Sequence, residues 1–209
     1  MSEAQYLDTI LSCKWDAALL EPVAELNTEI LDALVGAPLR HPGNSAEASL
    51  HWQWRALGEP ARLRLARCPY LLVDAGFARP ELWASLPHAG VHEGVPVSAL
   101  PHHRRPLATP LLRRILVFGW HLARSNGLGA RIALGMSPAC VSVMASCRFA
   151  DLEALAEQRP PWIRPRWDDR PEVWKAWLTA AAEESPYRLE RLQLWGLQRL
   201  AADVVAGVR

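Results

Sequence analysis

Residues Leu134–Gln158 read LGMSPACVSVMASCRFADLEALAEQ and predict two short helices joined by a tight turn. Ser137-Pro138 is typical of a helix start, because serine caps the first amides and proline suits the first helical position. We therefore expect one helix over 138–146, a turn at Cys147-Arg148 and a second helix over Phe149–Gln158. Such a pair is typical of helix-turn-helix regulators of DNA, and equally of any small helical domain.

Cap and stripe patterns predict further helices on both sides of this pair. Glu21-Pro22 begins an apolar stripe that ends at Gly36. Thr109, followed by Pro110, begins another helix, and Asp169 with Glu172 fits a capping box. The sequence therefore predicts an all-α fold, a compact bundle of about eight to nine short helices.

A long irregular segment divides the chain. Residues 87–106 contain four prolines and two glycines, which forbid regular structure over most of that length. A loop this long is usually functional or a linker. We expect an N-terminal helical region over 1–86, this Pro/Gly-rich internal loop, and a C-terminal helical domain over 107–209 that contains the helix-turn-helix-like pair 138–158.

Charge is segregated along a chain whose net charge is only +1. Between Gly94 and Ala150 there are seven arginines and no acidic residue, whereas both flanks are acidic on balance. Such a segment favours an anionic partner, either nucleic acid or an acidic protein face. The alternative is that the acidic flanks fold back and neutralise it. The expected anion-facing surface comprises Arg104, Arg105, Arg113, Arg114, Arg124, Arg131, Arg148, Arg164 and Arg166.

Alternating tryptophan and arginine form a second candidate interface. Residues 161–167 read PWIRPRW, and the prolines keep this segment extended. Exposed tryptophan and arginine together are typical of protein interfaces. Trp162 and Trp167 are therefore predicted to dock a partner, with core packing as the alternative for the many tryptophans of the C-terminal third.

The sequence contains little that suggests catalysis. It has no glycine-rich phosphate loop, no G-x-S-x-G and no H-E-x-x-H. His88 and His92 are four residues apart, but Gly90 between them breaks the helix that would join them at one metal. We expect a protein that is not an enzyme and that has neither a metal nor a cofactor.

Cysteine usage and hydropathy indicate the compartment. Cys13, Cys68, Cys140 and Cys147 form no C-x-x-C pair, so four reduced thiols are expected. No apolar run reaches the length of a membrane span, and the first residues lack the features of a secretory signal. A cytoplasmic bacterial protein is the expectation.

From about Leu116 to Asp168 the chain resembles the D subunit of the bacterial flagellar master transcription regulator. The resemblance lies in LVFGWHLARSNGLGARIALG, in Leu134–Ser137, in the pattern of Leu152 and 155–157, and in Arg166-Trp167-Asp168. It covers about a quarter of the chain, and the family's cysteine near the end of the motif is Ile163 here. The resemblance implies an all-helical protein that forms a homodimer and binds a C subunit, which carries zinc and much of the DNA contact.

The acidic second helix fits that division of labour. It carries Asp151, Glu153 and Glu157 but no basic residue, and carboxylates repel phosphates. DNA would therefore be met through the arginines and through the partner subunit. Under this hypothesis the chain is a non-enzymatic regulator that reaches DNA only in a complex.

A second resemblance supports a different class of function. The segments CPYLLVDAGFARPELW, which begins at Cys68, and LLRRILVFGWHLA, which begins at Leu111, are similar to helical accessory proteins of type III secretion systems. These proteins are adaptors that bind other proteins at the cytoplasmic face of the injectisome. The alternative hypothesis is therefore a cytoplasmic helical adaptor that acts by protein–protein binding.

Overall fold

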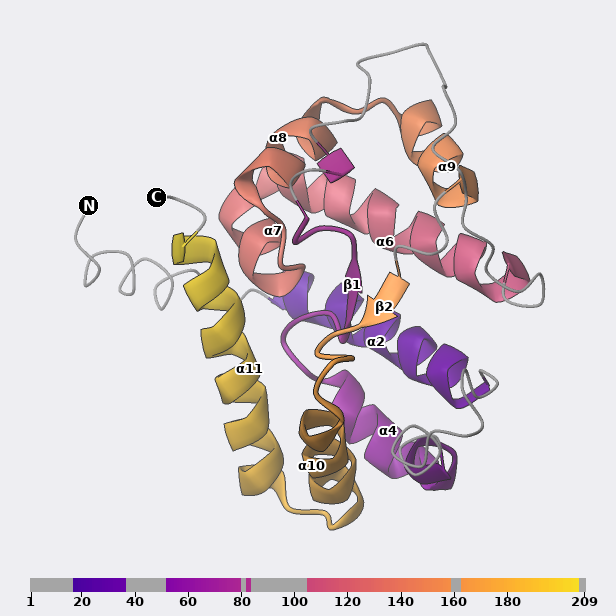
Figure 1. Ribbon diagram of the computed structural model, residues 1–209, viewed down its shortest axis with the longest axis vertical. Coiled ribbons are helices and arrows are strands. Elements are labelled where there is room, and N and C mark those ends of the chain that lie inside the picture. The colour runs from indigo at the N-terminus through magenta and orange to yellow at the C-terminus, as the bar shows by residue number, and fades with distance from the viewer. Residues whose placement is uncertain (1–16, 37–51, 80–81, 84–104, 159–162, 207–209) are drawn as a thin grey trace.

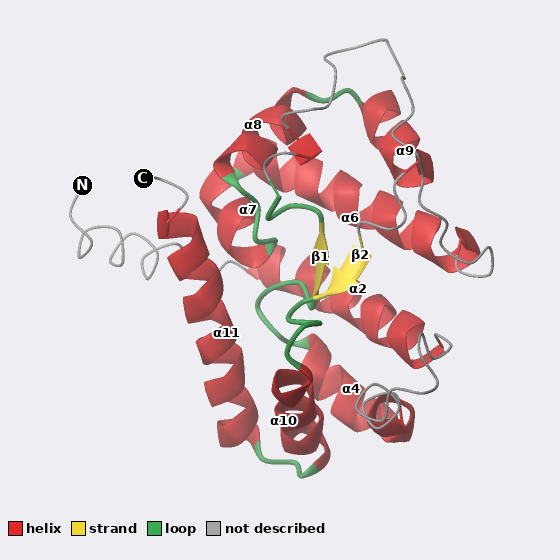
Figure 2. Cartoon of the chain, in the orientation of Figure 1, coloured by secondary structure: helices red, strands yellow, loops and turns green. Residues whose placement is uncertain are grey.

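The computed structural model describes residues 17–36, 52–79, 82–83, 105–158 and 163–206, and it is mostly helical (Figures 1 and 2). This confirms the predicted fold class, with the addition of a short two-stranded sheet that was not predicted. The helices are α2 (Ala17–Gly36), α4 (Glu59–Ala66), α6 (Arg105–Ser125), α7 (Gly127–Ala133), α8 (Pro138–Ser146), α9 (Phe149–Gln158), α10 (Pro171–Ala182) and α11 (Pro186–Ala206), and the strands are β1 (Val73–Ala75) and β2 (Ile163–Pro165).

The predicted helix pair is confirmed at both of its helices. The Ser137 hydroxyl accepts a hydrogen bond from the Cys140 amide at 3.1 Å, as expected of a serine cap at the start of α8. At the start of α9 the Asp151 carboxylate accepts from the Arg148 amide at 2.9 Å, which is one half of a capping box. Local cap chemistry therefore determines both helix starts.

Three other predicted helix starts are wrong. Within the described residues, Pro22 lies inside α2 and Pro110 lies inside α6, so neither proline is at the first helical position. A proline removes one backbone hydrogen bond of the helix, and here the turn before each proline is helical despite that loss. The N-cap of α10 is Arg170, without a side-chain hydrogen bond, in place of the Asp169 capping box.

The predicted internal loop is only partly within the described chain. Its last two residues, 105–106, belong to α6 and are helical, which corrects the boundary of the predicted loop. Residues 84–104 lie outside the part of the chain that the structure describes. The same holds for His88 and His92.

The two strands form an antiparallel ribbon near the middle of the molecule. Asp74 pairs with Arg164, Val73 with Pro165 and Ala75 with Ile163. In Figure 1 α6, α8 and α9 lie toward one end of the molecule and α4 and α10 toward the other. Val73 and Ala75 are buried in the core, whereas Asp74 between them is only partly covered, because side chains alternate across a strand.

Residues from before and after the predicted linker pack together in one hydrophobic core. The helix α2 packs against α4 and α6, and α10 packs against α4 and α11. Three large tryptophans, Trp83, Trp174 and Trp177, are fully buried. Core packing therefore accounts for much of the tryptophan content of the described chain.

A buried amide joins α2 to the segment before β1. Asn27 is fully buried within the apolar stripe of α2. Its Nδ2 lies 2.9 Å from the Tyr70 carbonyl oxygen and 3.2 Å from those of Ala66 and Cys68. Its Oδ1 accepts from the Leu72 amide at 2.9 Å. This one side chain therefore satisfies backbone groups that lead into the ribbon.

Candidate functional site

Three arginines of the predicted anion-facing surface are paired with carboxylates of the chain itself. Arg113 lies 3.5 Å from Glu157, and Arg148 lies 3.0 Å from Asp151. Arg114 forms an ion pair with Glu29. These contacts join α6 to α9 and to α2, and within α9 they hold its first turn. The positive charge of these side chains is therefore partly neutralised within the fold.

Arg166 does not belong to that surface, and its predicted exposure is wrong. The side chain is buried, with only 6% of its surface accessible. Its Nε donates to the Leu71 carbonyl at 2.6 Å and its Nη2 to the Leu134 carbonyl at 2.6 Å. A guanidinium has five donors in a fixed fork, so one arginine can hold two chain segments together. Arg166 is therefore a structural clamp.

The remaining arginines of the predicted surface are dispersed. Arg124 lies over the Trp120 ring, 4.9 Å from its centroid. Arg131 is half-buried, and Arg164 is exposed on β2. The backbone of Arg105 begins α6, and Arg104 lies outside the described residues.

The predicted docking tryptophans do not form an exposed strip. Trp162 lies outside the described residues, and Trp167 is half-buried. The Trp167 ring packs edge-on against Trp177 at 5.3 Å, and it also contacts Tyr70 and Trp195. Its backbone is in the left-handed region, at φ 53°, where the chain turns from β2 toward α10. The Trp167 ring therefore packs at the edge of the core, and its role in docking a partner stays a prediction.

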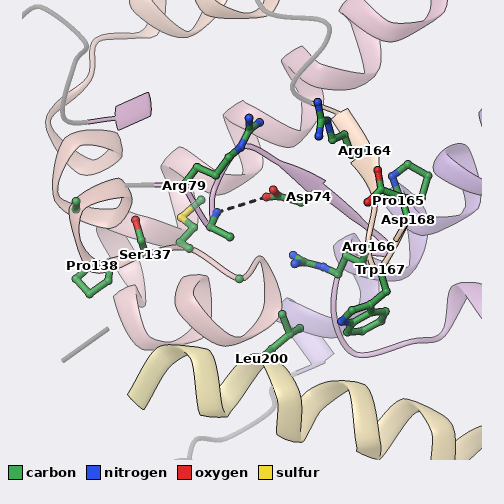
Figure 3. A pocket seen from close by; sticks show the side chains of 14 residues that line it. Asp74, Arg79, Ser137, Pro138, Arg164, Pro165, Arg166, Trp167, Asp168 and Leu200 are labelled. Carbon is green, nitrogen blue, oxygen red and sulfur yellow. Dashed lines mark hydrogen bonds between the residues drawn. The ribbon is translucent and has the colours of Figure 1, made fainter. Parts of the chain in front are cut away.

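A pocket of about 570 Å³ lies where the ribbon, the start of α8 and the C-terminal half of α11 meet (Figure 3). Asp74 and Arg164 face it from opposite strands, and Ser137 faces it from the cap of α8. Leu200 on α11 lines the opposite wall. The volume falls within the range of small-ligand and peptide side-chain pockets.

Charged side chains dominate the polar lining of this pocket. Arg79, Arg164 and Arg166 line it together with Asp74 and Asp168. One oxygen of Asp74 is occupied locally, since it accepts from the Phe77 amide at 2.9 Å. Within the described chain, no carboxylate forms an ion pair with Arg79 or Arg164. The lining is therefore positive on balance and retains unpaired guanidinium groups.

One of these guanidinium groups contains a buried nitrogen without a partner. The Nη2 of Arg79 is covered from solvent and makes no hydrogen bond. Arg113 also has a buried nitrogen without a bond, but it keeps its ion pair with Glu157. A buried donor without an acceptor is costly, so such a group indicates a site for a water or an anion.

The hydroxyl in the pocket lining and two thiols of the described chain are bonded or buried. The pocket lining contains no histidine or cysteine, and the Ser137 hydroxyl is occupied as a helix cap. Burial raises the pKa of the Cys68 thiol to about 12, and burial also raises that of Cys140. Since the thiolate is the nucleophile, these thiols are poorly suited to catalysis. No group of His, Cys, Asp and Glu in the described ranges is arranged to hold a metal ion.

Sequence reasoning did not find Arg79, Asp74 or Asp168. A signal was present at Arg164-Pro165-Arg166, since alternate residues of an extended segment share one face. Asp74 and Arg79 could not be added without the pairing of β1 with β2. That pairing joins segments about ninety residues apart in the sequence.

Comparison with known proteins gave no match to a protein-family model, and neither the curated proteins nor the solved structures contain a significant match. Among the helices of the described ranges, none is long and apolar enough to cross a membrane.

Proposed function

We propose that the chain acts by binding another protein, as a helical adaptor of the type III secretion kind, at the cytoplasmic face of such a system. The proposal rests on one observation: four arginines of the predicted anion-facing surface already bind groups of the chain itself. Arg113, Arg114 and Arg148 are paired with carboxylates of the chain, and Arg166 is bonded to backbone carbonyls. DNA affinity depends on arginines that are free to replace phosphate counterions, and these four are already engaged.

The second helix of the pair also favours a protein partner. In α9, Glu153 and Glu157 are exposed and Asp151 is partly exposed. A recognition helix in the major groove would bring these carboxylates close to phosphates, which is unfavourable. The arrangement supports the adaptor hypothesis over a regulator that touches DNA.

Exposed apolar side chains supply further contact area for a protein. Tyr187 and Leu194 are 71% and 54% accessible, and they lie seven residues apart, on one face of α11. Phe149 at the start of α9 is 50% accessible. Aromatic side chains of this kind are enriched at protein interfaces.

Affinity capture of the tagged full-length chain from its native host tests this proposal. The expected result is recovery of secretion-system components, at a yield that nuclease treatment leaves unchanged. Recovery of a second regulator subunit, together with DNA that nuclease removes, would support the transcription hypothesis instead. Sedimentation of the purified chain would separately reveal the homodimer that this second hypothesis implies.

A further inference from the structure

We infer that the pocket between the ribbon and the start of α8 binds a carboxylate side chain of the partner protein, next to an apolar residue of the same partner segment. This inference rests on the proposed function, because it assigns the chemistry by which the adaptor recognises its partner. It commits to an acidic, partly apolar peptide segment as the occupant.

The charge of the lining favours a carboxylate. Arg79 and Arg164 have no ion-pair partner in the described chain, although each lies at the pocket. The buried Nη2 of Arg79 lacks an acceptor. Guanidinium groups bind carboxylates through two parallel hydrogen bonds, so a partner carboxylate would satisfy both the charge and the missing bond.

The apolar part of the lining favours a hydrophobic neighbour of that carboxylate. Met136 and Pro138 border the pocket on the α8 side, and Leu200 borders it on α11. The Trp167 ring completes this wall. Met136 and Leu200 are themselves buried, so the apolar surface left for a ligand is that of the exposed Pro138 and the half-buried Trp167. An aliphatic or aromatic side chain of the partner would cover that surface.

The acidic part of the lining argues against a nucleic acid. Asp74 and Asp168 line the same pocket as the arginines, and carboxylates repel a phosphate backbone. A single carboxylate carries less charge than a phosphate track and can approach Arg79 and Arg164 alone. Asp168, which is exposed, can then accept a hydrogen bond from the peptide backbone.

A selection of random blocked heptapeptides on the full-length chain tests the inference. The wild type is expected to enrich peptides that carry Asp or Glu beside Leu, Ile or Phe. Arg164→Glu is expected to abolish the acidic enrichment, because it reverses the charge at an exposed position where it does not disturb the core. Arg199→Glu is the matched control, since Arg199 is also an exposed arginine but lies outside the pocket.

The selected peptide is then titrated against each variant. Replacing its acid by the amide, or Arg164 of the protein by Glu, should weaken binding roughly 10- to 100-fold, the range for losing a charge-assisted hydrogen bond. The Arg199→Glu variant should bind like the wild type. Absence of acidic enrichment, or equal enrichment on Arg164→Glu, would overturn the inference. Competition by a mixed-sequence DNA duplex that depends on Arg164 would also overturn it.

The outcome separates the pocket from the adaptor function. If the partner is captured normally by the Arg164→Glu variant, the adaptor proposal stands and the pocket assignment fails. If no protein partner is captured by the wild type, the adaptor proposal itself fails.

Discussion

The Arg166→Met substitution should lower the free energy of unfolding more than a substitution at any exposed arginine. The substitution removes two hydrogen bonds of 2.6 Å, to the carbonyls of Leu71 and Leu134. A hydrogen bond to a charged group contributes about 1.5–3 kcal/mol, so the two together give a loss of roughly 3–6 kcal/mol. That is a large fraction of the roughly 5–15 kcal/mol that holds a typical domain folded.

Urea unfolding followed by circular dichroism measures this loss. The midpoint should fall while the slope stays constant, since the folded and unfolded surfaces change little. Arg164→Met is the control, because it removes an exposed arginine two positions earlier and should cost less than about 0.5 kcal/mol. A loss of unfolding free energy below about 1 kcal/mol for Arg166→Met, or one equal to that of the control, would refute the role of Arg166 as a structural clamp.

Gly135→Ala perturbs the same clamp from the opposite side. A Cβ at Gly135 would lie 2.8 Å from both terminal nitrogens of Arg166, and the glycine has φ +65°. The guanidinium would have to move, and the backbone conformation would be strained as well. We expect a loss of more than about 1 kcal/mol in the same assay.

Three further predictions concern the rest of the described chain. Asn27→Leu should cost roughly 3–5 kcal/mol in urea unfolding, because it removes the buried amide's bonds to several backbone groups; a loss below about 1 kcal/mol would contradict that role. Cys68 and Cys140 should not react with a thiol reagent at pH 8 until denaturant is added, since burial raises the pKa of each thiol; rapid labelling of the native chain at these positions would be inconsistent with it. The Asp151 pKa is lowered by the side-chain hydrogen bond from Arg148, so its stabilising effect should be complete above the ordinary carboxyl range and disappear as the pH falls through the lowered value; an NMR titration with an ordinary Asp151 pKa would exclude this contact.

Local signals in the sequence predicted the helix starts where cap and proline chemistry agree. Ser137-Pro138 precedes a helix in the structure, as predicted. Pro22 and Pro110 gave the same signal but lie inside helices, because the apolar stripe that follows each proline can be extended by one more turn upstream. Local rules therefore predict the presence of a helix more accurately than the residue at which it begins.

The candidate site depends on contacts that no local rule contains. Arg164 lies on β2 and Arg166 directly follows that strand, two residues later, yet one is exposed and the other is buried. The difference arises from the carbonyls of Leu71 and Leu134, which approach Arg166 from distant parts of the chain. The net charge of the segment is the same for either arginine, and only the tertiary structure shows that Arg164 is exposed and Arg166 is buried.

The pairing of β1 with β2 has a consequence for the newly made chain on the ribosome. The bond from Arg166 to Leu71 spans 95 residues, and that from Tyr70 to Gln193 spans 123. At roughly 5–20 residues per second, about 5–25 s pass between synthesis of the apolar segment around Leu71 and synthesis of these two partners. During that interval it is an exposed, strand-forming sequence, which makes it a natural point for a chaperone to bind. A chain truncated before Arg166 would never form these contacts.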